Sequence, residues 1–204
     1  MKFLIIGAGF IFPAHAQAIK EIGGQIVGVV DREKGENTWI DAVKDTVADC
    51  VVLLTPNDLH FKMAKLSAEQ GKIVLCEKPL VIMEDQARIL AQKKNIFTVL
   101  QLRHHPLVGE IKKAISERQK DEVEMNIFFK RDESYANGWK GDKRRSGGFL
   151  FNLGIHYFDL LLYLFGDAEK IETKIIKEGI INGLTDAEAR GTIEGGNYIC
   201  FNLF

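Results

Sequence analysis

The chain has 204 residues, of which 46 % are hydrophobic and 27 % are charged, and its formal net charge is -1. This composition is typical of a folded protein, and the length suffices for one large domain or two small ones. A nearly neutral chain lacks the basic surface of nucleic-acid-binding proteins, so we expect no nucleic-acid partner. Its three cysteines form no CxxC pair, which favours a reducing compartment, and we expect a cytoplasmic protein.

One apolar stretch, residues 148–166, is long enough to resemble a membrane span. It contains Asn152, His156 and Asp159, and polar or charged side chains are costly in lipid. We therefore expect this stretch to be a helix of a folded domain, and we expect no membrane partner.

The first half of the chain alternates apolar strands with helices. The expected strands cover residues 2–6, 25–30, 49–55, 72–77 and 96–101. The helices expected between them cover residues 13–22, 59–70 and 83–93. Strands that are apolar throughout and alternate with helices predict a parallel sheet covered on both faces. We expect an α/β, doubly wound Rossmann domain over residues 1–101.

After residue 101 the pattern changes. Helices are expected over residues 107–118 and 149–165. Strand-like stretches cover residues 122–132, 170–177, 189–194 and 197–204. Long runs of strands beside a few helices predict an α+β domain with an antiparallel sheet, over residues 102–204.

A glycine turn follows the first predicted strand. Gly7 permits a tight turn, and Gly9 lets a phosphate approach the backbone at the start of a helix. Phe12 stands at the third glycine position of the dinucleotide fingerprint, so the turn alone is a weak signal. Asp31 ends the second strand about 20 residues further on, where an acid hydrogen-bonds a ribose hydroxyl. The order strand, turn, helix, strand, acid predicts NAD binding and favours NAD over NADP, although Arg32 opposes that preference.

A lysine ends the fourth predicted strand in the sequence Glu77-Lys78-Pro79. Ligands of open α/β sheets bind at the carboxyl ends of the strands, and Thr55 and Asn57 follow the preceding strand at the same edge. Lys78 can take a proton from a hydroxyl group if its pKa is lowered by burial and neighbours. The alternative is an ordinary surface lysine.

Polar residues recur on the second long helix. Asn152, His156 and Asp159 are spaced four and three apart, which places them on one stripe of a regular helix. The stripe either faces a polar substrate or forms a buried structural network. The adjacent His104 and His105 lack further ligands at metal spacing, so we expect no metal site.

Basic residues precede this helix. They are Lys140, Lys143, Arg144 and Arg145, and Arg103 follows the last Rossmann strand. They form either an anion clamp for a substrate phosphate or carboxylate, or a solvated loop.

Five motifs together resemble one enzyme family, the glucose–fructose oxidoreductase, inositol dehydrogenase and MocA (Gfo/Idh/MocA) family. They are GAGFIFPAH (7–15), VVD (29–31), TPNDLH (55–60), CEKPL (76–80) and GGFLFNLGIHYFD (147–159). The resemblance implies that Lys78 and His156 flank the reacting carbinol. It also implies a nicotinamide stacked over the sheet edge and a Lys78–Pro79 bond that is cis.

Within this family, the motifs QLRHHP (101–106), WKGD (139–142) and NLGIHYFD (152–159) are similar to UDP-N-acetylglucosaminuronate 3-dehydrogenases. This branch implies NAD-dependent oxidation of the sugar C3 hydroxyl, in the biosynthesis of surface polysaccharides such as lipopolysaccharide. Many members have an aspartate where Asn152 stands. Because an amide cannot take a proton, Asn152 would only orient the sugar, which leaves Lys78 or His156 as the base.

The resemblance, combined with the patterns above, assigns residues to each role. The cofactor residues are Gly7, Gly9, Phe10, Ile11, Asp31, Thr55, Asn57, His60, Glu77, Lys78 and Gln101. The substrate residues are Lys78, Arg103, His104, Lys140, Asn152, His156 and Asp159. The partners expected are a nucleotide sugar and, as a homo-oligomer, further copies of the chain.

Two features depart from the family pattern. Residues 31–51 are too few for its usual helix and strand, and the last strand-like run reaches Phe204, where family members continue. We therefore expect the second domain to be incomplete at its C-terminus. The alternatives are an oxidoreductase of this family acting on another sugar or cyclitol, and a truncated, non-catalytic dinucleotide-binding subunit.

Overall fold

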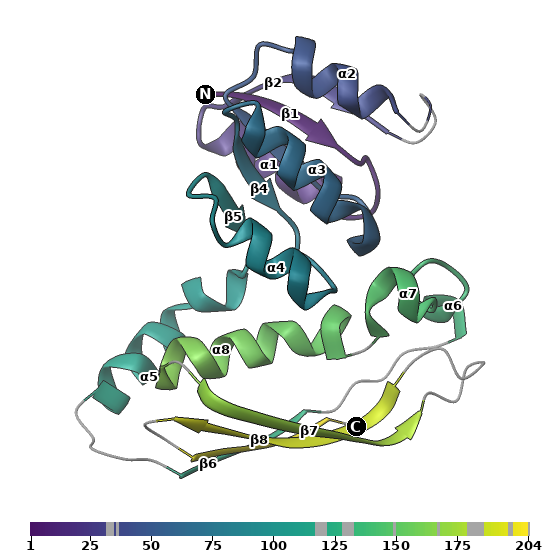
Figure 1. Cartoon of the computed structure of the whole chain (residues 1–204). Coiled ribbons are helices and arrows are strands. Elements are labelled where there is room, and N and C mark those ends of the chain that lie inside the picture. The colour runs from purple at the N-terminus through teal and green to yellow at the C-terminus, as the bar shows by residue number, and fades with distance from the viewer. Residues whose placement is uncertain are drawn as a thin grey trace. The chain divides into compact units, whose positions relative to one another are not determined.

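A computed structural model divides the chain into two compact units, Met1–Val99 and Leu100–Phe204 (Figure 1). It describes residues 1–31, 35, 37–116, 122–127, 133–148, 150–166, 168–178, 186–195 and 198–203.

The first unit contains a five-stranded sheet in which every strand pair is parallel. Its strands are β1 (Lys2–Ile6), β2 (Gln25–Val30), β3 (Cys50–Leu53), β4 (Ile73–Cys76) and β5 (Ile96–Thr98), in the spatial order β2-β1-β3-β4-β5. The chain therefore crosses over β1 between β2 and β3, which brings the ends of β1, β3 and β4 together. Parallel strands require such crossover connections, and helices provide them here.

Helices cover both faces of this sheet because alternate residues of each strand point to opposite faces. The helices are α1 (Phe12–Glu21), α2 (Thr38–Asp45), α3 (Asn57–Glu69) and α4 (Glu84–Leu90). On one face Leu4 and Leu53 pack with Val43 of α2 and Met63 of α3. On the other face Ile5 packs with Ile19 of α1. These two cores confirm the predicted doubly wound Rossmann sheet.

The connection between β2 and β3 differs from the sequence expectation. The sequence leaves too little room there for the family's usual helix and strand together; the structure has the helix α2, which buries Trp39 and Val43. Within the described part of this connection there is no additional strand. Eight residues suffice to add these two side chains to the core on one face of the sheet.

The second unit combines helices with a four-stranded sheet. Its helical segments are η2 (Gln101–His104), α5 (Pro106–Ser116), α6 (Glu133–Ala136), α7 (Lys143–Ser146), the π-helical turn η3 (Leu150–Gly154) and α8 (Ile155–Phe165). Its strands are β6 (Glu122–Ile127), β7 (Ala168–Glu178), β8 (Asp186–Gly195) and β9 (Tyr198–Leu203), in the order β6-β9-β8-β7. An α+β architecture is confirmed. The sheet is mixed rather than wholly antiparallel, because β6 pairs with β9 in parallel.

Helix α8 packs along this sheet (Figure 1). Leu161 is fully buried and contacts Met125 of β6 together with Phe158, Leu162 and Phe165 of its own helix. The helical stretch Lys143–Phe165 is long and apolar enough to cross a membrane by length and composition alone, a test that the core helix of a folded domain also passes.

Candidate active site

The turn after β1 requires glycine at its first position. The Gly7 N–H donates to the Val30 carbonyl at 2.8 Å, which ties the turn to the end of β2. Its φ of 102° lies in the region that only glycine adopts readily. A Cβ here would also lie 2.8 Å from the carbonyl carbon and oxygen of Leu54. The first glycine is therefore fixed by backbone geometry and by close packing.

The second glycine, Gly9, meets a different condition. A Cβ built on it finds no heavy atom within 4 Å, so the space in front of the turn is open. Helix α1 begins directly behind, with Pro13 in its first turn and no acidic side chain there. The unpaired N–H groups and the positive dipole end of such a helix favour an anion. Open space over Gly9 and a helix start free of acids fit the pyrophosphate of NAD.

The other cofactor residues near this turn differ in exposure. Phe10 is 96 % exposed, and Ile11 is the N-cap of α1. Asp31 directly follows β2, the position at which the dinucleotide fingerprint places its acid, and is half-buried. Thr55 follows β3, and its hydroxyl lies 3.6 Å from the Met63 sulfur.

His60 of α3 has no exposed surface. Its Nδ1 lies 2.8 Å from the Pro79 carbonyl oxygen and its Nε2 lies 2.8 Å from the Thr55 carbonyl oxygen. Burial lowers the pKa of His60, although both carbonyls and the nearby carboxylates of Glu77 and Asp58 oppose this shift. His60 is one of the residues that the resemblance assigns to the cofactor; in the structure its side chain is fully buried and contacts backbone carbonyls. Asn57 is buried as well, with 3 % of its surface exposed.

Glu77 links the end of β4 to α1. Its Oε1 lies 2.8 Å from His15 Nε2, and its Oε2 accepts the Lys78 backbone N–H at 3.3 Å. Burial would raise the pKa of Glu77, but the hydrogen bonds and charges of His15 and Lys78 outweigh it, so the pKa is lowered. Lys78 itself is half-buried, and the Lys78–Pro79 bond is cis, as the resemblance implied. Sequence reasoning missed His15, whose only signal is its place in the motif GAGFIFPAH.

In the second unit, Arg103 and Asp159 bind each other. Arg103 Nε donates to Asp159 Oδ2 at 2.8 Å, and Nη2 donates to Oδ1. The Asp159 carboxylate is nearly buried, and the guanidinium lies over the Tyr163 ring, 5.1 Å from its centroid. Hydrogen bonds to Asp159 raise the pKa of Arg103 above its usual value despite partial burial. Arg103 and Asp159, both predicted to bind the substrate, thus already neutralise each other's charge and hydrogen-bond each other.

Asn152 belongs to a second cluster. Its Nδ2 donates to the Tyr135 hydroxyl oxygen, and the Lys140 Nζ lies 5.1 Å from the centroid of the Tyr135 ring. The structure therefore brings together Asn152 and Lys140, which were predicted separately. Tyr135 was missed because nothing in its local sequence marks it.

The polar stripe predicted over residues 152–159 is not regular. Asn152 lies in the π-helical turn and is 5 % exposed, whereas half-buried His156 lies in the first turn of α8. The π-helical turn changes the angular spacing between them. Asn152 consequently bonds Tyr135, while Asp159 bonds Arg103.

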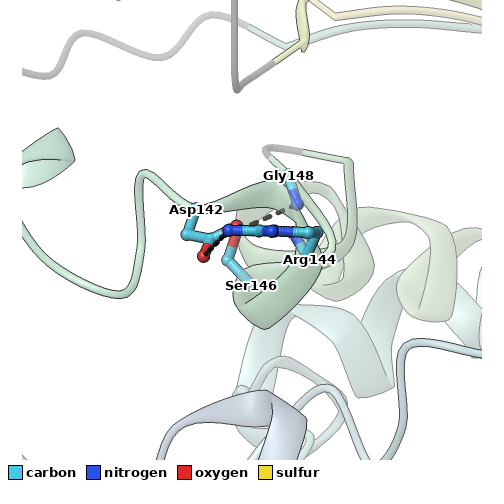
Figure 2. A network of polar contacts seen from close by, with 4 residues as sticks. All are labelled: Asp142, Arg144, Ser146 and Gly148. Atoms are coloured by element: carbon cyan, nitrogen blue, oxygen red, sulfur yellow. Dashed lines mark hydrogen bonds and ion pairs between the residues drawn. The ribbon is translucent and has the colours of Figure 1, made fainter. Parts of the chain in front are cut away.

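The basic segment before α8 forms its own network (Figure 2). Asp142 caps α7 by accepting the Arg144 N–H at 3.0 Å, and it also accepts bonds from the Arg144 guanidinium. Ser146 is fully buried, and its hydroxyl accepts the Gly148 N–H at 3.0 Å. The Arg144 side chain thus pairs with the cap of a short helix on an exposed surface, which favours the solvated alternative over the anion clamp for this residue.

The remaining candidates are surface residues. Gln101 and His104 are exposed at the two ends of η2. Among the residues that the structure describes, no three His, Cys, Asp or Glu side chains are grouped so that they could hold a metal ion.

Comparison with known proteins identifies relatives of both units. Residues 1–100 match the model of an oxidoreductase family with an NAD-binding Rossmann fold, Gfo/Idh/MocA, and residues 120–193 match the model of that family's C-terminal alpha/beta domain. The inositol 2-dehydrogenase of Rhizobium meliloti is 29 % identical over 185 residues, which cover 82 % of this chain and 56 % of the relative. The chain thus spans about half the length of the curated relatives it matches.

Solved structures are similar over the whole chain. The WlbA (WbpB) dehydrogenase of Thermus thermophilus, in complex with NAD and UDP-GlcNAcA, is 28 % identical with a TM-score of 0.80, and the match covers 100 % of this chain and 73 % of that protein. WlbA of Chromobacterium violaceum, in complex with NADH and UDP-GlcNAcA, is 25 % identical with a TM-score of 0.87, covering 100 % of this chain and 66 % of that protein. The two family matches together span most of the chain, and the first unit is an NAD-binding Rossmann domain: the protein belongs to the Gfo/Idh/MocA oxidoreductase family.

Proposed function

We propose that the protein is an NAD-dependent dehydrogenase that oxidises the C3 hydroxyl of a UDP-GlcNAcA-type nucleotide sugar. The similarity to WlbA dehydrogenases over the whole chain carries this proposal, because those proteins are solved with NAD or NADH and with UDP-GlcNAcA. A second candidate is oxidation of another sugar or a cyclitol. The relatives named inositol 2-dehydrogenase and glucose-6-phosphate 3-dehydrogenase favour it.

In this proposal the first unit binds the cofactor and supplies a base. Gly7 and Gly9 shape the turn for the pyrophosphate, and the Asp31 carboxylate accepts a hydrogen bond from a ribose hydroxyl. Bound NAD would accept the hydride from the carbinol carbon. The neutral Lys78 amine takes the proton of the sugar hydroxyl. Its main chain is held at the sheet edge by Glu77, which suits a group that must keep its position.

The second unit would bind the sugar. A nucleotide sugar with a uronate carries a diphosphate and a carboxylate, so its site needs cations. Lys140 is the better candidate, since the fork of Arg103 is already bonded to Asp159. Asn152 is oriented by Tyr135 and can position a sugar hydroxyl but cannot take its proton. His156 is the alternative base.

The test is a substrate panel. The protein is incubated with NAD and, in turn, UDP-GlcNAcA, UDP-GlcNAc, myo-inositol and glucose 6-phosphate, and the absorbance of reduced nicotinamide is followed. We expect turnover with UDP-GlcNAcA and an oxidised C3 in the product by NMR. Faster turnover of inositol or of glucose 6-phosphate would establish the second candidate instead. NAD binding without turnover of any sugar would favour the non-catalytic alternative.

Variants then assign the base. Lys78→Ala should reduce kcat by about 10²–10⁴-fold, as expected for loss of a general base, while the Kd for NAD changes little. His156→Ala serves as the matched comparison. If Lys78→Ala loses less than about tenfold and His156→Ala loses more, His156 is the base.

A further inference from the structure

We infer that His60 is a positioning residue for Lys78: its imidazole fixes the main chain that carries this lysine and contacts neither cofactor nor substrate. The inference rests on the proposed function only in that Lys78 acts there as the base. It assigns to His60 a role that differs from the cofactor contact expected from the sequence.

The first observation is where His60 lies. It belongs to α3 and has no exposed surface, yet both ring nitrogens lie 2.8 Å from backbone carbonyl oxygens. One oxygen belongs to Thr55, directly after β3 and Leu54, and the other belongs to Pro79, in the loop after β4. Buried carbonyl groups require hydrogen-bond partners, and a single side chain here lies within hydrogen-bond distance of carbonyls in two neighbouring loops.

The second observation is how the main chain around Lys78 is held. The Glu77 N–H donates to the Leu53 carbonyl at 3.0 Å, and the Lys78 N–H donates to the Glu77 carboxylate at 3.3 Å. His60 holds the carbonyl of the next residue, Pro79. The main chain is therefore held at the Glu77 and Lys78 N–H groups before the lysine Cα and at the Pro79 carbonyl after it, so the flexible side chain starts from a well-placed Cα.

The position of one proton matters for this role. A neutral imidazole carries a single N–H and can donate to only one of the two carbonyls, whereas an imidazolium donates to both. The charged groups that act on His60 are the carboxylates of Glu77 and Asp58. Positioning of Lys78 requires the N–H on Nδ1, which faces Pro79. The contact of Nε2 with Thr55 is not required.

A matched pair of variants separates the two contacts. In His60→Asn the amide nitrogen lies near the former Nδ1 and can still donate to Pro79. In His60→Gln it lies near the former Nε2 and can donate only to Thr55. Both variants are neutral and polar, and Gln is closer to His in volume than Asn is. A role of His60 in core packing alone would therefore make His60→Asn the more damaging variant, which is the opposite of the result expected here.

The first readout does not depend on turnover. The rate at which an amine-specific reagent labels Lys78 is measured by mass spectrometry, with exposed Lys65 as the internal control. We expect labelling of Lys78 to change by at least about threefold in His60→Gln and to stay within about twofold in His60→Asn, because only the first loses the Pro79 bond. Equal changes in both variants, or no change in either, would overturn the inference.

The second readout is kinetic. With the substrate found above, His60→Gln should lower kcat about tenfold more than His60→Asn, with little change in the KM for NAD, because misplacement of a reacting group by about 1 Å costs up to about 100-fold. If no substrate is turned over, the labelling experiment still decides the role of His60, and only the proposed function fails.

A third measurement covers the case in which the variants do not fold. Nitrogen-15 NMR of the unmodified protein reports which ring nitrogen of His60 carries a proton. A protonated Nδ1 is expected, alone or together with Nε2. An Nδ1 without a proton cannot donate to Pro79, and this result would overturn the inference.

Discussion

The two glycines of the phosphate turn make a prediction that separates folding from cofactor binding. In Gly7→Ala the new residue keeps a φ near 102°, and its Cβ would lie 2.8 Å from the Leu54 carbonyl. A strained backbone conformation costs about 1–3 kcal/mol, and overpacking against a fixed backbone costs about 1–3 kcal/mol. The sum, about 2–6 kcal/mol, is a large part of the typical 5–15 kcal/mol of folding stability.

Gly9→Ala adds the same methyl group but meets no heavy atom within 4 Å. We expect its unfolding free energy to stay within about 1 kcal/mol of the unmodified protein, since surface substitutions usually change stability little. Its methyl group would occupy the space over the turn, and the Kd for NAD should rise at least about tenfold because the backbone must approach the pyrophosphate closely.

Thermal unfolding measures the first effect and isothermal titration calorimetry with NAD the second. At about 2–4 °C per kcal/mol for a chain of this size, Gly7→Ala should lower Tm by at least about 4 °C. If Gly7→Ala has the same Tm as the unmodified protein, the reasoning from backbone geometry is refuted. A Gly9→Ala protein that binds NAD normally would show that the open space over Gly9 is not the pyrophosphate site.

Three further predictions concern individual side chains. Because the pKa of His60 is lowered from 6.5, the unfolded chain binds a proton that the folded chain does not, so the unfolding free energy should fall as pH drops below 6.5, by up to about 1.4 kcal/mol per pH unit. The slope should flatten in His60→Asn, whereas the lowered pKa of Glu77 predicts a separate loss that begins only below pH 4.5. Tyr135→Phe removes the acceptor of a buried amide while keeping the ring, so steady-state kinetics should show a KM for the sugar several-fold higher at an unchanged Kd for NAD. Arg103→Ala leaves the nearly buried Asp159 carboxylate without its guanidinium partner, so Tm should fall. Adding Asp159→Asn should recover part of that loss. A double variant as unstable as the single one would show that the ion pair is not the cause.

The Rossmann unit could be predicted from the sequence because its signals are local. Apolar runs gave its five strands to within a few residues at either end, and the glycine turn and Asp31 lie where the fingerprint places them. The helix α2 was missed because its apolar residues Trp39 and Val43 were too few, in a short connection, to reveal a period. The family spacing indicated too little room for the usual helix and strand together, but a helix of two turns fits.

The second unit was less predictable because its features depend on distant contacts. The parallel pairing of β6 with β9 joins segments about 75 residues apart, and no local pattern encodes it. The π-helical turn alters the spacing between Asn152 and His156, which helical periodicity treats as regular. Tyr135 has no local sequence signal, and His15 has only its place in the motif GAGFIFPAH. Their partners, Asn152 and Glu77, are distant in sequence, and only the fold reveals them.

Variants in the two units should therefore be distinguished by different measurements. The cofactor side depends on main-chain geometry at Gly7, Gly9 and the loop around Lys78, so its variants should change the Kd for NAD or the stability of the fold. In the proposed function, sugar binding would depend on the side chains of Tyr135 and Asn152, so variants of these residues should change the KM for the sugar. Lys78 alone is assigned to cofactor, substrate and proton transfer together. A variant that only displaces Lys78 should lower kcat more strongly than it changes either affinity, and His60→Gln is the variant that the hydrogen bonds at the sheet edge single out for this effect.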